Sequence, residues 1–408
     1  MTVTNTLSVQ TPAPAVESQR NYNYSLGYLR AFIVVLVVAH HAALAYHPFA
    51  PPPPSSLVQE PRWWQAFPVV DPLRGSWAAL LTGFNDTFFM SLMFLLSGLF
   101  VWNGLTAKGS ARFLSGRLLR LGVPFLIATA LLAPLAYYPA YLQILGHSGF
   151  DGFVRQWLAL GTWPAGPAWF IWVLLVFDCI AALLFAMAPR WAETVGEFVA
   201  GSQDRPARFF AMLVVASVAL YVPLALAFSG LRWTAFGPFT FQTSRILHYL
   251  LYFLAGVCIG AWGMQRGPLR TGGKLARRWL LWVVAAIVAF LAASAIAIAF
   301  LSAHLQSKNW EAATGMMFSV SCAASSFAFL GLFLRFARSR SRIFESLSRN
   351  SYGIYLVHYA FVNWLQLALV DAPMPGILKF AIVVCGAVAA SWLTTIALRR
   401  IPGVARVV

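Results

Sequence analysis

The sequence predicts an all-α fold, a polytopic bundle of about ten transmembrane helices. Of its 408 residues, 60% are hydrophobic and only 10% are charged, and the mean hydropathy is +0.72. A water-soluble domain could hardly bury so large an apolar fraction. The apolar residues also form separate runs of roughly 20 residues, which is the length an α-helix needs to cross the hydrocarbon core of a bilayer.

Ten such runs follow one another along the chain, separated by shorter segments that are more polar or contain proline. Each run is long enough for one crossing, and the segments between them mark the turns. We expect the crossings near residues 26–46, 77–102, 122–140, 167–188, 209–228, 245–264, 279–301, 311–334, 351–370 and 376–398.

The predicted loops differ in charge between the two sides of the bundle. The side that carries both termini holds 21 of the 29 Lys and Arg residues, the opposite loops hold five, and three lie within or at the ends of spans. By the positive-inside rule, both termini face the cytoplasm. The net charge of +17 therefore orients the chain and contacts anionic lipid, and we expect no nucleic-acid partner.

The segments outside the spans are too short to form a soluble domain, and the longest loop, residues 50–76, contains the run Pro51–Pro54. The polar N-terminal residues include no apolar stretch of the kind found in a cleavable signal. We expect flexible cytoplasmic tails at 1–24 and 401–408 and one transmembrane domain at 25–400. The four cysteines lie in apolar segments without metal-ligand spacing, and no metal is expected.

The first predicted span, "YLRAFIVVLVVAHHAALAYHP", contains Arg30, His40 and His41. At about 100° per residue, Arg30 and His41 share one helix face to within about 20°, whereas His40 points elsewhere. The rise of an α-helix separates Arg30 from His41 by roughly 16 Å, from the cytoplasmic entrance to mid-membrane.

Two interpretations fit this pair. Arg30 can snorkel to anchor the helix end while His41 hydrogen-bonds a neighbouring helix. Alternatively, a cation at the mouth and a titratable imidazole deeper on the same face suit a long anionic donor with a reactive inner end, such as an acyl-CoA.

Other segments complete a pattern. "FFMSLMFLLSGLF" (88–100) precedes "ARFLSGRLLRLGVPF" (111–125), "GPAWFIWVLLVFD" (166–178) and "RNSYGIYLVHYAF" (349–361). With the Arg-x10-His spacing of the first helix, this order closely resembles the acyltransferase 3 family of integral membrane acyltransferases over residues 24–400. Many members carry an acidic residue shortly before the Ser-Gly pair, where this chain has Ser91 and Leu92, with Asp86 further upstream. In this respect the chain resembles the branch of the family that includes glucan succinyltransferases.

The resemblance implies that His41 is the central catalytic residue, acting as general base or carrying the acyl group itself. It implies that Arg30, Arg117 and Arg120 bind the donor, although positive-inside anchoring also explains the latter two. Arg30, His358 and Asp178 are further catalytic candidates. Structural roles are open for His358 and Asp178, and Arg30 or His41 are possible partners of Asp178.

The sequence thus predicts a membrane-bound O-acyltransferase of the bacterial inner membrane. It would move an acetyl or succinyl group from acyl-CoA to a hydroxyl of an envelope glycan or similar acceptor. The alternative is a proton-coupled transporter or flippase that uses His41, His358 and Asp178 as a proton relay without covalent chemistry. The acyl group, the acceptor, the oligomeric state and the roles of Asp86 and Asp178 are not decided by the sequence.

Overall fold

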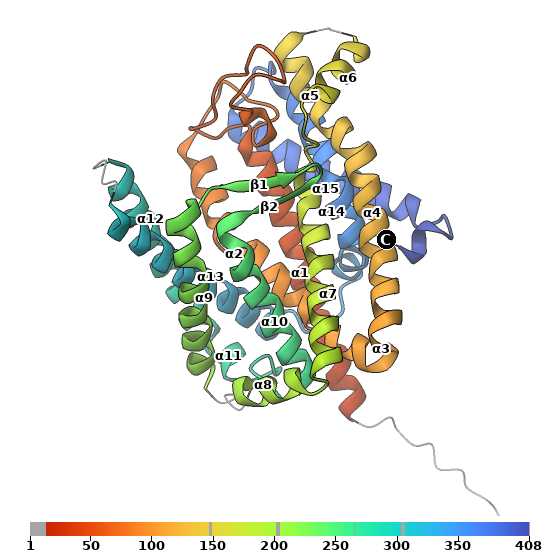
Figure 1. The fold of residues 1–408 in the computed structure, drawn as a ribbon, viewed down its shortest axis with the longest axis vertical. Helices are drawn as coiled ribbons and strands as arrows, with labels where there is room; N and C mark the ends of the chain where they lie inside the picture. Colours follow the sequence, from red (N-terminus) through yellow and green to blue (C-terminus); the bar gives the residue numbers. More distant parts are fainter. Residues whose placement is uncertain (1–13, 147–148, 201–204, 265, 303–306, 408) are drawn as a thin grey trace, which may run out of the picture.

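The computed structural model describes residues 14–146, 149–200, 205–264, 266–302 and 307–407. It is a helical bundle, as predicted, elongated along the direction of its helices (Figure 1). Within these residues, nine helical segments are long and apolar enough to cross a membrane. Eight of them contain the helices α1 (Pro14–Leu44), α2 (Ser76–Gly98), α7 (Trp169–Met187), α9 (Pro206–Phe228), α10 (Ile246–Trp262), α12 (Trp279–Ser302), α13 (Lys308–Phe336) and α15 (Gly376–Leu398).

The ninth segment, Val101–Leu145, is a single long path of 45 residues. It starts earlier than the predicted span at 122–140, and it is interrupted at Gly109, whose φ of 71° lies in the left-handed region. It consists of α3 (Val101–Arg117), a π-helical turn (Leu118–Gly122), α4 (Val123–Ile127), a second π-helical turn (Ala128–Leu132) and α5 (Ala133–Leu145).

Prolines explain how this path departs from a regular helix. Pro124 has no N–H to donate to the carbonyl of Arg120, and Pro139 has none for Leu135. Both carbonyls instead accept hydrogen bonds from α14 (Arg342–Leu369), from the Tyr352 hydroxyl at 2.7 Å and the Trp364 indole at 3.0 Å. The backbone groups that proline frees inside the membrane are thus satisfied by a neighbouring helix.

Helix α14 forms the tenth crossing, although its first turns are polar. Near its start, the Ser341 backbone N–H donates to the Tyr28 hydroxyl on α1. Near its end, the Gln366 amide donates to the carbonyls of His41 and Ala42. Because it accompanies α1 from Tyr28 to Ala42, α14 runs parallel to α1 through the same depth, which agrees with the prediction of about ten helices.

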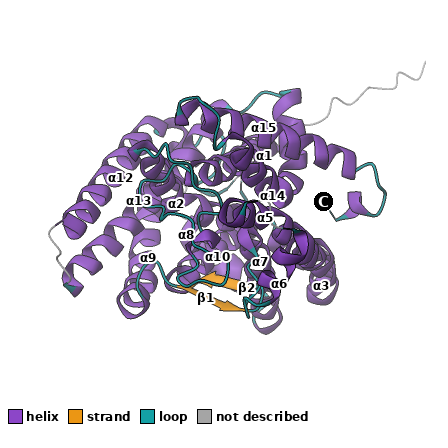
Figure 2. Cartoon of the chain, turned by 90° about the horizontal axis from the view of Figure 1, so that it is seen from above, coloured by secondary structure: helices purple, strands orange, loops and turns teal. Residues whose placement is uncertain are grey.

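The helices that carry the candidate site lie in the middle of the bundle. Figure 2 shows α1, α2 and α14 near its centre, whereas α9, α12 and α3 lie at its rim. In α2, 67% of the spanning window is buried, against 17% in α12, so α12 presents most of its surface to lipid.

Three glycines allow α2 and α10 to pack in close contact. A Cβ added at Gly256 of α10 would overlap the carbonyl of Leu95 in α2, and one added at Gly260 would overlap that of Leu99, the residue after α2. One added at Gly98 would overlap the carbonyl of Phe253. The GxxxG pattern of α10 therefore serves close packing inside one bundle.

Smaller elements complete the two faces. Toward the end of the bundle opposite the start of α1 lie α6 (Phe150–Leu158) and an antiparallel hairpin of β1 (Trp233–Phe236) and β2 (Phe239–Gln242), while α8 (Trp191–Ala200) and α11 (Lys274–Arg277) lie at the same end as the start of α1 (Figure 1). The hairpin was not expected, although the aromatic and Thr residues around its Gly237 turn are typical of strands.

An even number of crossings leaves both ends of the described chain on one side, the side rich in Lys and Arg, which we call cytoplasmic. The predicted tail at residues 1–24 falls partly on residues 1–13, which lie outside the described residues. From Pro14 onward the chain is part of α1.

Candidate active site

The cytoplasmic side contains a cavity of about 600 Å³ between α1, α2, α3, α7 and α14. Its lining includes six basic side chains and, among the described residues, no Asp or Glu. Three of the six, Arg30, Arg117 and Arg120, are the residues predicted to bind the donor. The other three were not predicted, and they are Lys108, Arg349 and Arg406.

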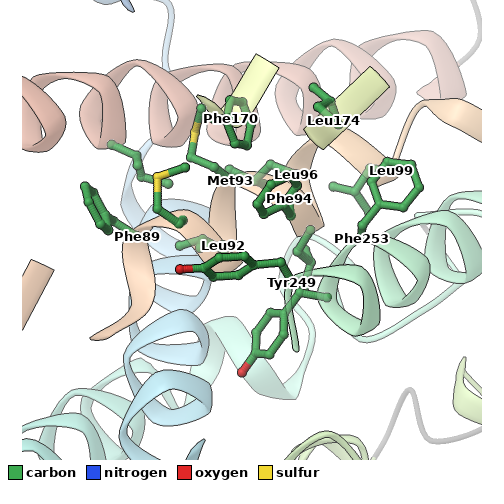
Figure 3. Close-up of a cluster of buried hydrophobic side chains, with 14 of the residues drawn as sticks. Phe89, Leu92, Met93, Phe94, Leu96, Leu99, Phe170, Leu174, Tyr249 and Phe253 are labelled. Atoms are coloured by element: carbon green, nitrogen blue, oxygen red, sulfur yellow. The ribbon is translucent and has the colours of Figure 1, made fainter. Parts of the chain in front are cut away.

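The inner part of this cavity is apolar. Met93 and Leu96 of α2 face Phe170 and Leu174 of α7 there, within the buried cluster that Figure 3 shows. Ser97, in the predicted Ser-Gly pair, also lines the cavity, and its hydroxyl donates to the carbonyl of Met93 at 2.8 Å. The cavity is therefore cationic at its mouth and apolar toward the membrane interior.

Arg117 is held in the cavity wall by two contacts. Its Nε lies 3.3 Å from Oδ2 of Asp178, and its guanidinium lies 5.0 Å from the centre of the Phe113 ring. Asp178 therefore pairs with neither Arg30 nor His41, the two possible partners, and its carboxylate is fully buried behind Arg117. Asp178 partly compensates the charge of Arg117 and fixes its position.

Arg120 is exposed in the cavity and lies in the π-helical turn Leu118–Gly122. Pro124 leaves the backbone carbonyl of Arg120 without its usual helical donor. That carbonyl accepts a hydrogen bond from the Tyr352 hydroxyl of α14 at 2.7 Å, which holds the backbone of Arg120 in place. Tyr352 also lines the cavity. A π-helical turn at this position changes the direction of the side chain, as such turns frequently do at functional sites.

His41 lies deeper and forms a pair with His358. The two imidazole rings are 5.2 Å apart, centroid to centroid, in an edge-to-face arrangement. Nδ1 of His41 lies 2.8 Å from the carbonyl of Val37, and Nδ1 of His358 lies 2.6 Å from that of Tyr355. Since a carbonyl only accepts, both Nδ1 atoms carry the proton.

This tautomer leaves Nε2 of each ring as the atom with the free lone pair. Nε2 of His358 is buried and has no hydrogen-bond partner among the described residues. His41 is partly exposed, and its ring also contacts Tyr359 at 4.9 Å. The pair therefore offers two unprotonated nitrogens inside the membrane domain, of which that of His41 is the more accessible.

His40 points in another direction, as the helix geometry predicted. Its ring lies 5.2 Å from that of Phe89 on α2. Asp86, the acidic residue upstream of the Ser-Gly pair, is bound to Arg245 at 2.8 Å. Neither His40 nor Asp86 lines the cytoplasmic cavity.

The histidine pair does not itself line the cytoplasmic cavity. Tyr355 connects the two sites, since it lines the cavity and its ring lies 5.7 Å from that of His358. Its hydroxyl is held by the carbonyl of Pro167. The sequence "YLVH" could have indicated that Tyr355 lies beside His358, because residues three apart on a helix are neighbours.

The fold and the site define a multi-pass membrane protein with a cationic cytoplasmic cavity that ends at Tyr355, beside the histidine pair. Residues 23–396 match the family model described as an acyltransferase domain. The chain therefore belongs to the acyltransferase 3 family and is a membrane-bound acyltransferase. This assignment favours the enzyme over the carrier hypothesis.

Among curated proteins, the chain is similar to "Glucans biosynthesis protein C" of Salmonella gallinarum (strain 287/91 / NCTC 13346), with 24% identity over 260 residues. It is equally similar to the protein of that name from Salmonella enteritidis PT4 (strain P125109). Each alignment covers 57% of this chain and 57% of the relative. No solved structure gives a significant match.

Proposed function

We propose that this acyltransferase takes a short acyl group, acetyl or succinyl, from acyl-CoA and transfers it to a hydroxyl of an envelope glycan. The observation that carries the proposal is the cytoplasmic cavity, with six basic side chains toward its mouth and an apolar inner end directly below His41 and His358.

The shape and charge of the cavity suit a coenzyme A thioester. This donor carries several phosphate charges at one end and a thioester at the end of a long arm. Guanidinium groups bind phosphate through charge-assisted, often bidentate, hydrogen bonds. The apolar inner end would hold the acyl arm away from water, with Tyr355 between the thioester and the histidine pair.

The tautomer of His41 suits both chemical routes. In the first, Nε2 accepts the proton of the acceptor hydroxyl while that oxygen attacks the thioester carbonyl. The carbon–sulfur bond then breaks, and the proton passes to the departing CoA thiolate. In the second, Nε2 attacks the thioester carbonyl, the carbon–sulfur bond breaks and CoA leaves as the thiolate. The hydroxyl then displaces the imidazole from the acyl group, and its proton converts the thiolate to the thiol.

The class of acceptor rests on similarity. The relatives are named for glucan biosynthesis, and a carbohydrate hydroxyl is the nucleophile that such an acyl transfer needs. A bacterial inner membrane would place the basic side of the bundle in the cytoplasm, where acyl-CoA is made.

The test uses purified protein with radiolabelled acetyl-CoA or succinyl-CoA and a neutral glucan. We expect CoA release that depends on the glucan, together with label in the glucan. Release that is the same without acceptor, or no release with either donor, would contradict the proposal.

A further inference from the structure

The outer face carries two adjacent hollows that the acyl donor does not use. Their volumes are about 320 and 280 Å³, and both are lined by Glu60, Pro61 and Trp63. Trp63 stands between them with 54% of its surface exposed. Large aromatic side chains are usually buried, so an exposed indole between two hollows is a candidate ligand-binding surface.

The loop that presents Trp63 is rigid. The next residue, Trp64, is almost fully buried, and its indole donates to the carbonyl of Leu57 at 2.9 Å. On the other side, Arg62 donates to the carbonyl of Leu160 at 2.8 Å and to the Thr162 hydroxyl at 3.1 Å. The residues on both sides of Trp63 are thus fixed, so the loop itself needs little ordering when a ligand binds.

The charges of these hollows exclude an anionic ligand such as coenzyme A. The charged residues that line them are Glu60 and Arg62, which form an ion pair at 2.9 Å. The larger hollow also contains the uncharged polar groups of Gln65, Thr162 and Thr240. Hydrogen-bonding groups without net charge around an exposed indole suit a neutral ring with one apolar face and hydroxyls at its edge, which describes a sugar.

A row of ring contacts links this loop to the histidine pair. Trp64 contacts Tyr137 at 5.3 Å, Tyr137 contacts Tyr359 at 5.5 Å, and Tyr359 contacts His41 at 4.9 Å. The hydroxyl of Tyr137 also donates to the carbonyl of Gln65, which lines the larger hollow. His41 thus lies between the cytoplasmic cavity and the outer hollows.

We propose that the two outer hollows are the binding site of the acceptor, a neutral glycan whose sugar ring stacks on Trp63 and whose hydroxyls bond to Glu60, Arg62 and Gln65. This inference rests on the proposed function, because it assigns the acceptor of that reaction to the face opposite the donor.

The test compares Trp63→Ala and Trp63→Phe in the purified full-length protein, with Trp233→Ala as matched control. Trp233 is also an exposed outer tryptophan, 49% exposed, but it lines neither hollow. Binding of a neutral gluco-oligosaccharide is measured by calorimetry, and binding of acyl-CoA is measured separately. We expect Trp63→Ala to raise the Kd for the oligosaccharide about tenfold or more, Trp63→Phe to raise it less, and Trp233→Ala to leave it unchanged.

Equal effects at Trp63 and Trp233, or none at either, would overturn the inference, since Trp63 would then be an ordinary interface anchor. Unchanged acyl-CoA binding in all variants shows that they are folded. If the oligosaccharide binds in a Trp63-dependent way but no acyl group is transferred, the glycan site stands and the proposed reaction fails.

Discussion

At the scale of single residues, the first helix shows what spacing can and cannot predict. Helical periodicity placed Arg30 and His41 on one face and His40 on another. The structure confirms that the two histidines face different neighbours, because His41 contacts His358 while His40 contacts Phe89. Periodicity gives no information about the neighbouring helix. The partner of Asp178 was therefore not predicted, since Arg117 reaches it from a different segment.

The two histidines give a direct comparison. His41→Gln should abolish acyl transfer, because glutamine cannot accept a proton at neutral pH and a positioned base contributes about 10²–10⁴ in rate. His40→Gln should retain substantial activity, since His40 faces α2 away from the site. The measurement is acyl transfer at equal amounts of folded protein, with acyl-CoA binding checked in both variants. An active His41→Gln variant would show that the histidine pair has only a structural role.

Donor binding by Arg117 and Arg120 can be distinguished from simple membrane anchoring. Replacing Arg117 and Arg120 together by Gln should raise the KM for acyl-CoA tenfold or more, because each lost contact to phosphate is worth about 1.5–3 kcal/mol. The KM for the acceptor should change little. Replacing Arg277 and Arg278 by Gln removes the same two charges from the cytoplasmic face outside the cavity. Equal KM changes in the two double variants would mean that only the surface charge matters.

At the scale of elements, the apolar runs predicted most helices, but their irregularities depended on partners that the sequence does not name. Pro124 lies just after the first π-helical turn of the third crossing and Pro139 lies inside α5, and both prolines are visible in the sequence. Which groups bind the freed carbonyls follows only from the position of α14. The hairpin at residues 233–242 was missed because its strands are only four residues long and lie between two apolar runs.

One buried ion pair fixes the outer loop to the last helix. Nζ of Lys379 on α15 lies 2.8 Å from Oδ2 of Asp71, and both side chains are almost completely buried. Lys379 also donates to the carbonyl of Val370 at 2.7 Å. Lys379→Met should lower the free energy of unfolding by about 3–5 kcal/mol, because it leaves the carboxylate of Asp71 buried without a counter-charge, with only the backbone N–H of Leu73 as partner.

The double variant Asp71→Asn/Lys379→Met should recover part of that loss, since it leaves no unpaired charge. Thermal unfolding in detergent, with all variants in the same buffer, measures both effects. A single Lys379→Met variant as stable as the unchanged protein would show that the pair contributes nothing to the attachment of the loop.

At the scale of the whole molecule, composition and charge predicted the class of fold and its orientation. Apolar length determines how many times a chain crosses, and Lys and Arg asymmetry determines which face is inside. Neither quantity specifies where cavities form. The cytoplasmic cavity requires α3 and the C-terminal Arg406 to come together with α1 and α14, and these contacts depend on packing between segments distant in the sequence.

If the donor binds on the cytoplasmic side and the glycan on the opposite face, the acyl group must pass through the site of His41 from one side of the membrane to the other. Vesicles containing the protein with its basic face outward, and a neutral glucan trapped inside, test this most directly. Labelled acetyl-CoA or succinyl-CoA is added only outside, with His41→Gln vesicles as control. The account predicts label in the enclosed glucan with the unchanged protein and none with His41→Gln. Label in glucan supplied outside but never in enclosed glucan would contradict it.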